Sequence, residues 1–173
     1  MSAIPEGTAR SSLVRQLQAA YSGELAAAYS YRGHWRSLTR PREREQRDED
    51  RRIEEAEWHH RRLVGELLAE LGAGPSRRRE LVMGTIGRVF GSLCHVSGWL
   101  LPMLFAGRLE AMNVGQYDTA ARAAGDLGLA HWVPVLEEMT AEEGRHEAFF
   151  AACARTHRFA LLSRVVGWRL PHD

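Results

Sequence analysis

Apolar residues recur along most of the chain at the spacing of a helix with one buried face. From residue 11 to about residue 38 they stand three or four positions apart, which predicts a first helix. Pro41 interrupts the pattern, and a strongly charged second helix then runs to Leu71, before the loop signal GAGPS at residues 72–76. The same period from residue 132 to about residue 157 predicts a last long helix, followed by a short amphipathic tail.

A long apolar segment lies between the second and the last of these helices. It begins at Leu81, ends at Gly107 and continues into a more polar helical stretch that ends near Gly128. The third helix is expected here, with a break near Gly98 or Pro102. Four main helices with an extra apolar helical piece between the second and third predict an all-α four-helix bundle.

Composition narrows the class of protein. At 173 residues, with 45% hydrophobic and 26% charged residues, the chain reads as one soluble globular domain, residues 1–173. The formal charge of +1 gives no general attraction to nucleic acid, which is not an expected partner. Cys94 and Cys153 form no CxxC pair, and the first twelve residues do not read as a secretory signal, so a cytoplasmic protein is expected.

Two Glu-x-x-His motifs place a carboxylate and an imidazole on apolar helix faces. Glu57 and His60 share the stripe of Ile53, Val64 and Leu67, whereas His59 falls on the charged face. Burying such groups costs several kcal/mol unless something compensates, and a bound metal ion is the usual compensation where Glu and His converge. This motif is therefore a candidate pair of metal ligands.

The second motif is in the last long helix. Glu143 and His146 share a stripe with apolar residues, among them Met139 and Phe150, whereas Glu142 is assigned to the solvated side. A single Glu-x-x-His motif is more often a surface pattern than a ligand pair. Two inward-facing motifs together favour a metal site.

Two further acids complete the candidate ligand set. Glu24 stands in the buried stripe of the first helix, and Glu110 in that of the third. Glu24 precedes Glu57 by 33 residues, and Glu110 precedes Glu143 by the same 33, so the chain reads as two similar helix pairs. Two divalent cations would neutralise about four carboxylate charges, and the mixed oxygen and imidazole ligands favour iron, or manganese in one or both sites.

Glu24, Glu57xxHis60, Glu110 and Glu143xxHis146 resemble the six ligands of the ferritin-like di-iron carboxylate proteins. The short chain, the apolar segment and the stretch EAMNVGQY, with Tyr117 seven residues after Glu110, are most similar to the demethoxyubiquinone hydroxylase family. That family has His where Gln116 stands here, and a longer stretch before the third-helix Glu.

The resemblance implies an O2-activating di-iron monooxygenase or oxidase. Its substrate would be a small lipophilic compound, hydroxylated as a quinone ring is in that family, and its electrons would come from an external donor. Two alternatives stay open. The same site oxidises iron or reduces peroxide in ferritins and rubrerythrins, although no CxxC-bearing domain is present, and a helical bundle without catalysis is a weaker alternative. A homodimer is a candidate assembly.

Residues near the ligands have more ordinary interpretations. Tyr31 and Tyr117 are expected to be core residues with hydrogen-bonded hydroxyls rather than redox partners. They and Gln116 are the candidates for positions around the ligands. His34 and the two cysteines receive no role.

The segment from Leu81 to Gly107 has two interpretations. It packs as core through a close contact of Gly87 and Gly91, or it forms a face for a membrane or an apolar channel to the metals, which would place the protein at the inner face of the membrane. Arg88, His95 and Pro102 make a membrane-spanning helix improbable. Trp99 and Leu104 are the positions expected to face lipid or ligand if the second interpretation holds.

Overall fold

The computed structural model describes residues 6–171, and these residues form helices joined by short turns. The predicted domain also includes residues 1–5 and 172–173, which lie outside the described part. The α-helices are α1 (Glu6–Ser37), α2 (Arg44–Glu70), α3 (Arg77–Ser97), α4 (Leu100–Asp126), α5 (Val133–Arg155) and α6 (Leu162–Val165). Short 3-10 turns, Pro41–Glu43 and Ala130–Trp132, precede α2 and α5.

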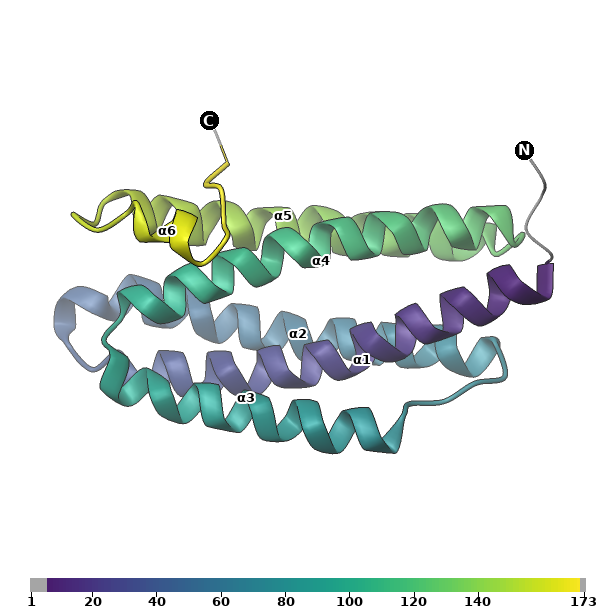
Figure 1. Ribbon diagram of the computed structural model, residues 1–173, viewed down its shortest axis with the longest axis horizontal. Coiled ribbons are helices and arrows are strands. Elements are labelled where there is room, and N and C mark those ends of the chain that lie inside the picture. The colour runs from purple at the N-terminus through teal and green to yellow at the C-terminus, as the bar shows by residue number, and fades with distance from the viewer. Residues whose placement is uncertain (1–5, 172–173) are drawn as a thin grey trace.

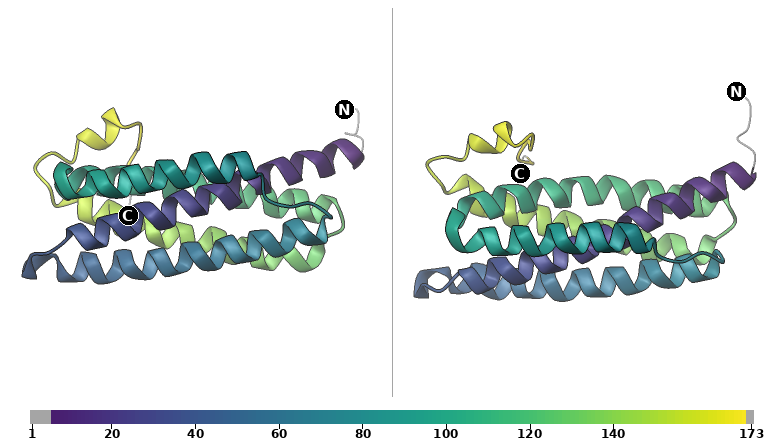
Figure 2. Two further views of the ribbon diagram at one scale, coloured as in Figure 1. Left: turned by 90° about the horizontal axis from the view of Figure 1, so that it is seen from below. Right: turned by 60° about the horizontal axis from the view of Figure 1, so that its bottom comes forward.

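Four long helices form a bundle of two pairs, α1 with α2 and α4 with α5 (Figure 1). The pairs also meet along α1 and α4. The all-α bundle expected from the apolar pattern is therefore confirmed for the described residues. Figure 2 shows α3 on the outside of the bundle, alongside α1.

The expected third helix is two helices, α3 and α4, and the break lies at Gly98. This residue has a φ of 73°, which places it in the left-handed region that glycine adopts without strain. Pro102 does not break the chain. It stands in the first turn of α4, where the missing backbone N–H has no helical partner to lose.

The bundle interior contains two groups of packed apolar side chains with polar residues between them. One group includes Leu17, Leu67 and Leu136, and the other includes Met103 and Phe150. The polar residues among them are mainly acids and histidines, and their burial requires compensation.

Two faces of α3 have different environments. A Cβ atom on Gly87 would lie 2.5 Å from the carbonyl oxygen of Ala26, and one on Gly91 would lie 2.7 Å from that of Tyr29, so α3 and α1 pack backbone to backbone. The opposite face leaves large apolar side chains exposed, including Leu81 (74%) and Val96 (81%). The glycine contact and an open apolar face are thus both present, on different sides of one helix.

The expectation for Leu104 was wrong. Its side chain is fully buried in the second core group, because it faces the interior of the bundle from α4. Trp99 is half-buried and its ring packs edge-on against His157. Within residues 6–171, no helix combines the length and the apolar character that crossing a membrane requires.

Candidate metal centre

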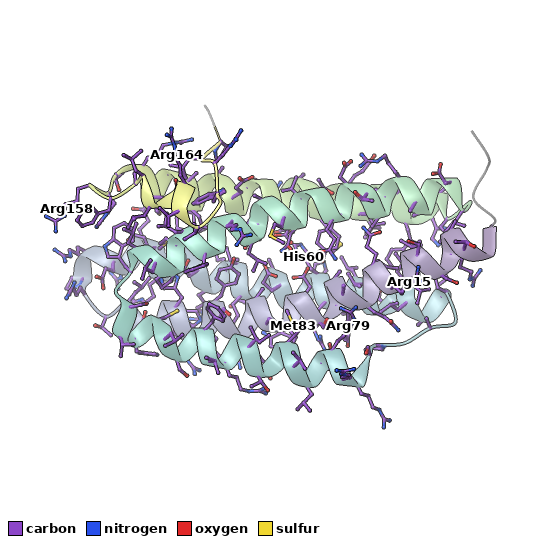
Figure 3. The ribbon with its side chains drawn as sticks, in the orientation of Figure 1. Arg15, His60, Arg79, Met83, Arg158 and Arg164 are labelled. Atoms are coloured by element: carbon purple, nitrogen blue, oxygen red, sulfur yellow. The ribbon has the colours of Figure 1, made fainter. Side chains whose placement is uncertain are left out.

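The six predicted ligands lie together in the middle of the bundle. Glu24 comes from α1, Glu110 from α4, and the two Glu-x-x-His motifs from α2 and α5. All six side chains are buried, and His146 is the most exposed of them at 7%. Figure 3 shows His60 in the interior between the helix pairs. The periodicity argument therefore placed each of these side chains on the correct face.

The ligand atoms form two overlapping groups. Glu24, Glu57, His60 and Glu143 form one group, and Glu57, Glu110, Glu143 and His146 form the other, with the ligand atoms of each group within 4.8 Å of one another. Glu57 and Glu143 belong to both groups. Two cation positions side by side, with two shared carboxylates, are what this arrangement could hold.

Unpartnered atoms mark the same two positions. Eight buried nitrogen and oxygen atoms of these residues make no well-directed hydrogen bond, although two of them, Nδ1 of His60 and Oε1 of Glu143, lie 3.1 Å apart. They are both carboxylate oxygens of Glu57 and of Glu143, Oε2 of Glu24 and of Glu110, and Nδ1 of His60 and of His146. Leaving so many polar atoms buried without partners would be very unfavourable, so this donor set fits bound cations.

The remaining oxygens of Glu24 and Glu110 accept hydrogen bonds from tyrosines. Tyr117 donates to Oε1 of Glu24, and Tyr31 donates to Oε1 of Glu110. Both tyrosines are core residues with bonded hydroxyls, as expected. Burial, and next the charge of the carboxylate each one contacts, raises the pKa of both tyrosines well above the ordinary value. They therefore stay protonated as donors.

The centre has an internal symmetry that includes these tyrosines. An offset of 86 residues carries Glu24 onto Glu110, Tyr31 onto Tyr117, and the first Glu-x-x-His motif onto the second. Each tyrosine follows the glutamate of its own helix by seven residues but donates to the glutamate of the other half. The two halves are thus joined by a reciprocal pair of buried hydrogen bonds.

Glu142, assigned to the solvated side, is partly exposed but also contacts a candidate ligand, which the sequence did not reveal. Its Oε2 lies 3.0 Å from Nε2 of His60, while Nδ1 of His60 lies 3.1 Å from Oε1 of Glu143. The carboxylate at the outer nitrogen holds the ring with its other nitrogen toward the ligand cluster. Its side chain is 31% exposed and stands at the boundary between the two environments. The one available signal was chemical: a buried ligand histidine needs a partner for its second nitrogen.

His146 faces the cluster in the same way. Its Nδ1 lies 3.6 Å from Oε2 of Glu143, and 4.0 Å from Oε1 of Glu57 and from Oε2 of Glu110. These separations are longer than hydrogen bonds and leave room for a shared cation.

Two other predicted positions have different outcomes. Gln116, a candidate for a position around the ligands, instead joins α4 to α1: its side-chain nitrogen donates to the carbonyl of Gln16, whose own side chain donates to the carbonyl of Gln116. His59 is exposed and contacts Arg62, as its place on the charged face predicted.

Burial controls the electrostatics of the cluster. It raises the pKa of Glu24, and it raises the pKa values of Glu57 and Glu110 well above the ordinary value, with further contributions from neighbouring carboxylates. Burial also acts on Glu143, but contacts with Glu110 and with the two histidines outweigh it, so this pKa is lowered. For His60, burial is outweighed by the glutamates around it, which raise its pKa to about 9. The metal-free centre therefore holds protons that a cation would displace.

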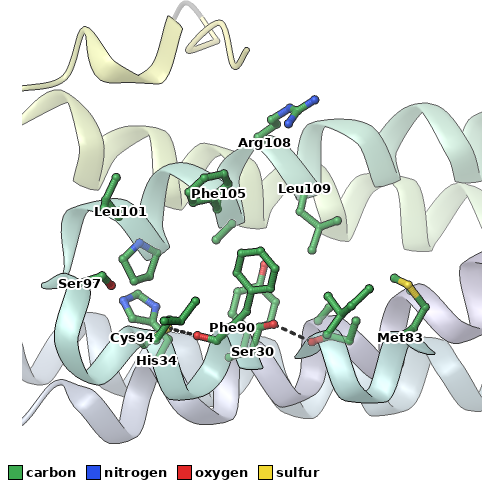
Figure 4. Close-up of a pocket in the computed structure, with 18 of the residues that line it drawn as sticks. Ser30, His34, Met83, Phe90, Cys94, Ser97, Leu101, Phe105, Arg108 and Leu109 are labelled. Carbon is green, nitrogen blue, oxygen red and sulfur yellow. Dashed lines mark hydrogen bonds between the residues drawn. The ribbon is translucent and has the colours of Figure 1, made fainter. Parts of the chain in front are cut away.

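An apolar cavity of about 410 Å³ lies next to the centre, between α1, α3 and α4. Tyr31 connects the two, because it lines the cavity and donates to Glu110. Figure 4 shows cavity-lining residues of all three helices, among them Phe90, Phe105 and Leu109. The segment from Leu81 to Gly107, for which the sequence left core packing and an apolar channel as alternatives, supplies many of the residues that line this cavity.

Comparisons with protein-family models, with curated proteins and with solved structures found no match to this chain. The assignment of the centre therefore depends on its own residues and their geometry.

Proposed function

We propose that the protein is a ferritin-like di-iron oxidoreductase that uses O2 to oxidise a small lipophilic substrate. The observation that carries this proposal is the set of eight unpartnered ligand atoms in two overlapping groups. Each group offers three carboxylates and one imidazole, a mixture that suits iron or manganese better than magnesium or calcium.

The chain's own residues have distinct tasks in this proposal. Glu57 and Glu143 are shared between the two positions, and Glu24 and Glu110 each belong to one. Tyr117 and Tyr31 each donate a hydrogen bond to Oε1 of one unshared glutamate. Each of these glutamates therefore turns its Oε2 toward the metals. When bound, a pair of iron ions supplies electrons to O2 and so allows oxidation of a nearby substrate. The buried surroundings exclude water from that reaction.

The cavity supports an organic substrate over iron or peroxide as the reactant. Iron oxidation and peroxide reduction need the ligand cluster alone, whereas a cavity of about 410 Å³ with apolar walls accommodates a lipophilic ring. Tyr31 lies at the cavity wall and contacts Glu110, so a bound ring would be close to the ligands. Hydroxylation of a quinone-like ring, with electrons from an external donor, is the reaction we favour.

The exposed face of α3 extends the proposal to a peripheral contact with a membrane. Leu81, Val89, Leu93 and Val96 are each about half exposed or more on this one helix, which is unusual for a surface that faces only water. The same helix lines the cavity through Phe90. A lipophilic substrate could pass from the bilayer to the cavity along this helix.

Oxygen uptake by iron-loaded protein tests the function. The protein is loaded with Fe(II) without air, and O2 consumption is measured with a reductant, with and without the short-chain quinone analogue 2-methoxy-5-methyl-1,4-benzoquinone. We expect a hydroxylated product whose oxygen derives from 18O2. Oxygen uptake that is indifferent to the quinone, with oxidised iron or consumed peroxide as its only result, would reject the hydroxylase in favour of iron or peroxide chemistry.

A further inference from the structure

A second buried polar pair lies outside the ligand cluster. Nδ1 of His34, on α1, lies 2.8 Å from Oδ2 of Asp50, on α2. The side chains are 2% and 0% exposed. His34 is one helical turn beyond Tyr31, and Asp50 is two turns before Glu57, so the pair lies further along the bundle than the ligands.

The bundle does not need a polar pair at this level. The offset of 86 residues that relates the two halves carries His34 onto Ala120 and Asp50 onto Leu136, and both of these are buried apolar core residues. Apolar side chains therefore close the equivalent place in the other half, where they avoid burying charge. The pair is present only in the half whose α1 is covered by α3 and which holds the cavity.

The protonation of the pair follows from its burial. A net charge in this interior would be far more unfavourable than a neutral pair. Neutrality is reached with His34 protonated on both nitrogens beside an ionised Asp50, or with a protonated Asp50 that donates to Nδ1. In both forms Nε2 of His34 carries a hydrogen. Burial, opposed by the nearby imidazole, raises the pKa of Asp50, which agrees with a proton held within the pair.

Nε2 of His34 is a buried donor without an acceptor on the protein. His34 lines the cavity, and Figure 4 shows its imidazole extending from α1 toward the side of α4 that carries Leu101.

The other polar side chains of the cavity wall have different roles. Ser30, Cys94 and Ser97 donate to backbone carbonyls, and Tyr31 donates to Glu110. Arg108 is exposed and points away from the cavity in Figure 4. Among the described lining residues, His34 thus has the one buried side-chain donor without a partner.

We propose that His34, held by Asp50, donates a hydrogen bond to the carbonyl oxygen of an uncharged lipophilic ligand in this cavity and so positions it. An anionic ligand would bring a net charge into apolar surroundings, so a ketone-type oxygen is the matching acceptor. Because Tyr31 is one turn away on the same wall, an oxygen on His34 leaves the adjoining ring beside Tyr31 and near Glu110. Identifying this ligand with the substrate rests on the proposed function, whereas its binding does not.

Two probes of the same shape test this hydrogen bond from His34, called the anchor below, in metal-free, full-length protein. 2-Acetylnaphthalene has a carbonyl oxygen where 2-isopropenylnaphthalene has a methylene group. Calorimetric titration should show the ketone binding about tenfold more tightly, which is the value of one buried hydrogen bond. Equal affinities, or no binding of either probe, would overturn the proposal.

Variants and a spectroscopic signal separate the anchor from a structural role. The double change His34→Phe with Asp50→Leu removes both polar partners together and should abolish the preference for the ketone. Ser30→Ala, which removes another polar group of the same wall, should leave it intact. In the unaltered protein the Nε2 proton of His34 should shift downfield in the NMR spectrum with the ketone and not with the alkene, and an unmoved signal would overturn the proposal even if the double variant does not fold.

These measurements involve neither iron nor O2. A negative result in these measurements would reject the anchor, whereas the proposed oxidoreductase function would still be decided by the oxygen-uptake experiment. Intact ketone preference without quinone-dependent oxygen uptake would instead reject the proposed function and retain the anchor.

Discussion

Tyr117 donates its hydroxyl hydrogen to Glu24, across the boundary between the two halves of the bundle. The mirrored bond from Tyr31 to Glu110 makes the arrangement reciprocal. Each glutamate therefore has one oxygen fixed by the opposite half and one left for a cation. The two helix pairs can be joined in this way only when both are in register, so the bonds link assembly of the fold to assembly of the site.

Loss of either tyrosine hydroxyl should lower the stability of the metal-loaded protein, although the aromatic ring still fills its place in the core. Tyr117→Phe keeps the ring but leaves Oε1 of Glu24 buried without a donor, so we expect the metal-loaded protein to lose about 1–3 kcal/mol of stability in urea denaturation. Tyr29→Phe is the control, because its hydroxyl contacts the exposed part of Arg88. If both changes have equally small effects, the crossed hydrogen bonds do not support the centre.

Glu142 should matter for metal binding although it is not a ligand. Glu142→Gln weakens the partner of Nε2 of His60, and such partners typically contribute 10- to 100-fold in metal affinity. Competition with a metal-sensitive chelator dye measures this change. Glu138→Gln, one turn earlier on the exposed side of α5, should retain the parent affinity. Equal metal affinities of the two variants would show that Glu142 does not contribute to metal binding.

The metal-free protein should become less stable as pH rises from about 5 to 9. The folded-state pKa values of Glu24, Glu57 and Glu110 are raised, and that of His60 is raised to about 9, so the folded chain binds more protons than the unfolded chain in this range. Stability contributed by these protons is present at the acid end and lost as each folded-state pKa is passed. Glu143, with a lowered pKa, acts in the opposite direction but only below its ordinary value.

Urea denaturation at a series of pH values checks this prediction. Metal binding displaces the same protons, so the metal-loaded protein should gain stability over this range where the metal-free protein loses it. A metal-free stability that rises toward pH 9 would contradict the protonation of the cluster.

An exposed position on α3 and a buried position on α4 should respond differently to substitution. Val96→Glu places a charge on the exposed face, so it should leave the melting temperature unchanged and lower co-sedimentation with liposomes. Leu104→Glu buries an unpaired charge in the core and should prevent stable folding. Parent protein that does not sediment with liposomes would remove the proposed membrane contact.

The sequence predicted which six side chains are buried together because every step of that prediction lay within one helix. Helical periodicity alone puts Glu57 and His60 on one face, and the repeated 33-residue spacing relates the two halves. The bundle followed from the same apolar stripes. The sequence also predicted a break near Gly98 or Pro102, and it lies at Gly98, because glycine tolerates the backbone angles found there.

Contacts between helices could not be predicted in this way. Glu142 reaches His60 of another helix, and His34 meets Asp50 across α1 and α2, so no spacing along the chain reveals either pair. The burial of Leu104 could not be predicted for the same reason. The residues of the apolar stretch around it are similar in character, and the packing of α4 against α5 and α1 decides which of them face the core.

Iron binding by ligand variants tests the metal centre most directly. Anaerobic titration of the parent with Fe(II) should reach about two irons per chain, one for each of the two overlapping groups of candidate ligands. Glu57→Ala and His146→Ala should each lose most of that binding, because the remaining buried charges are left uncompensated. His59→Ala, one position from a ligand but on the exposed face, should bind iron as the parent does. An unchanged stoichiometry in both ligand variants would contradict the site.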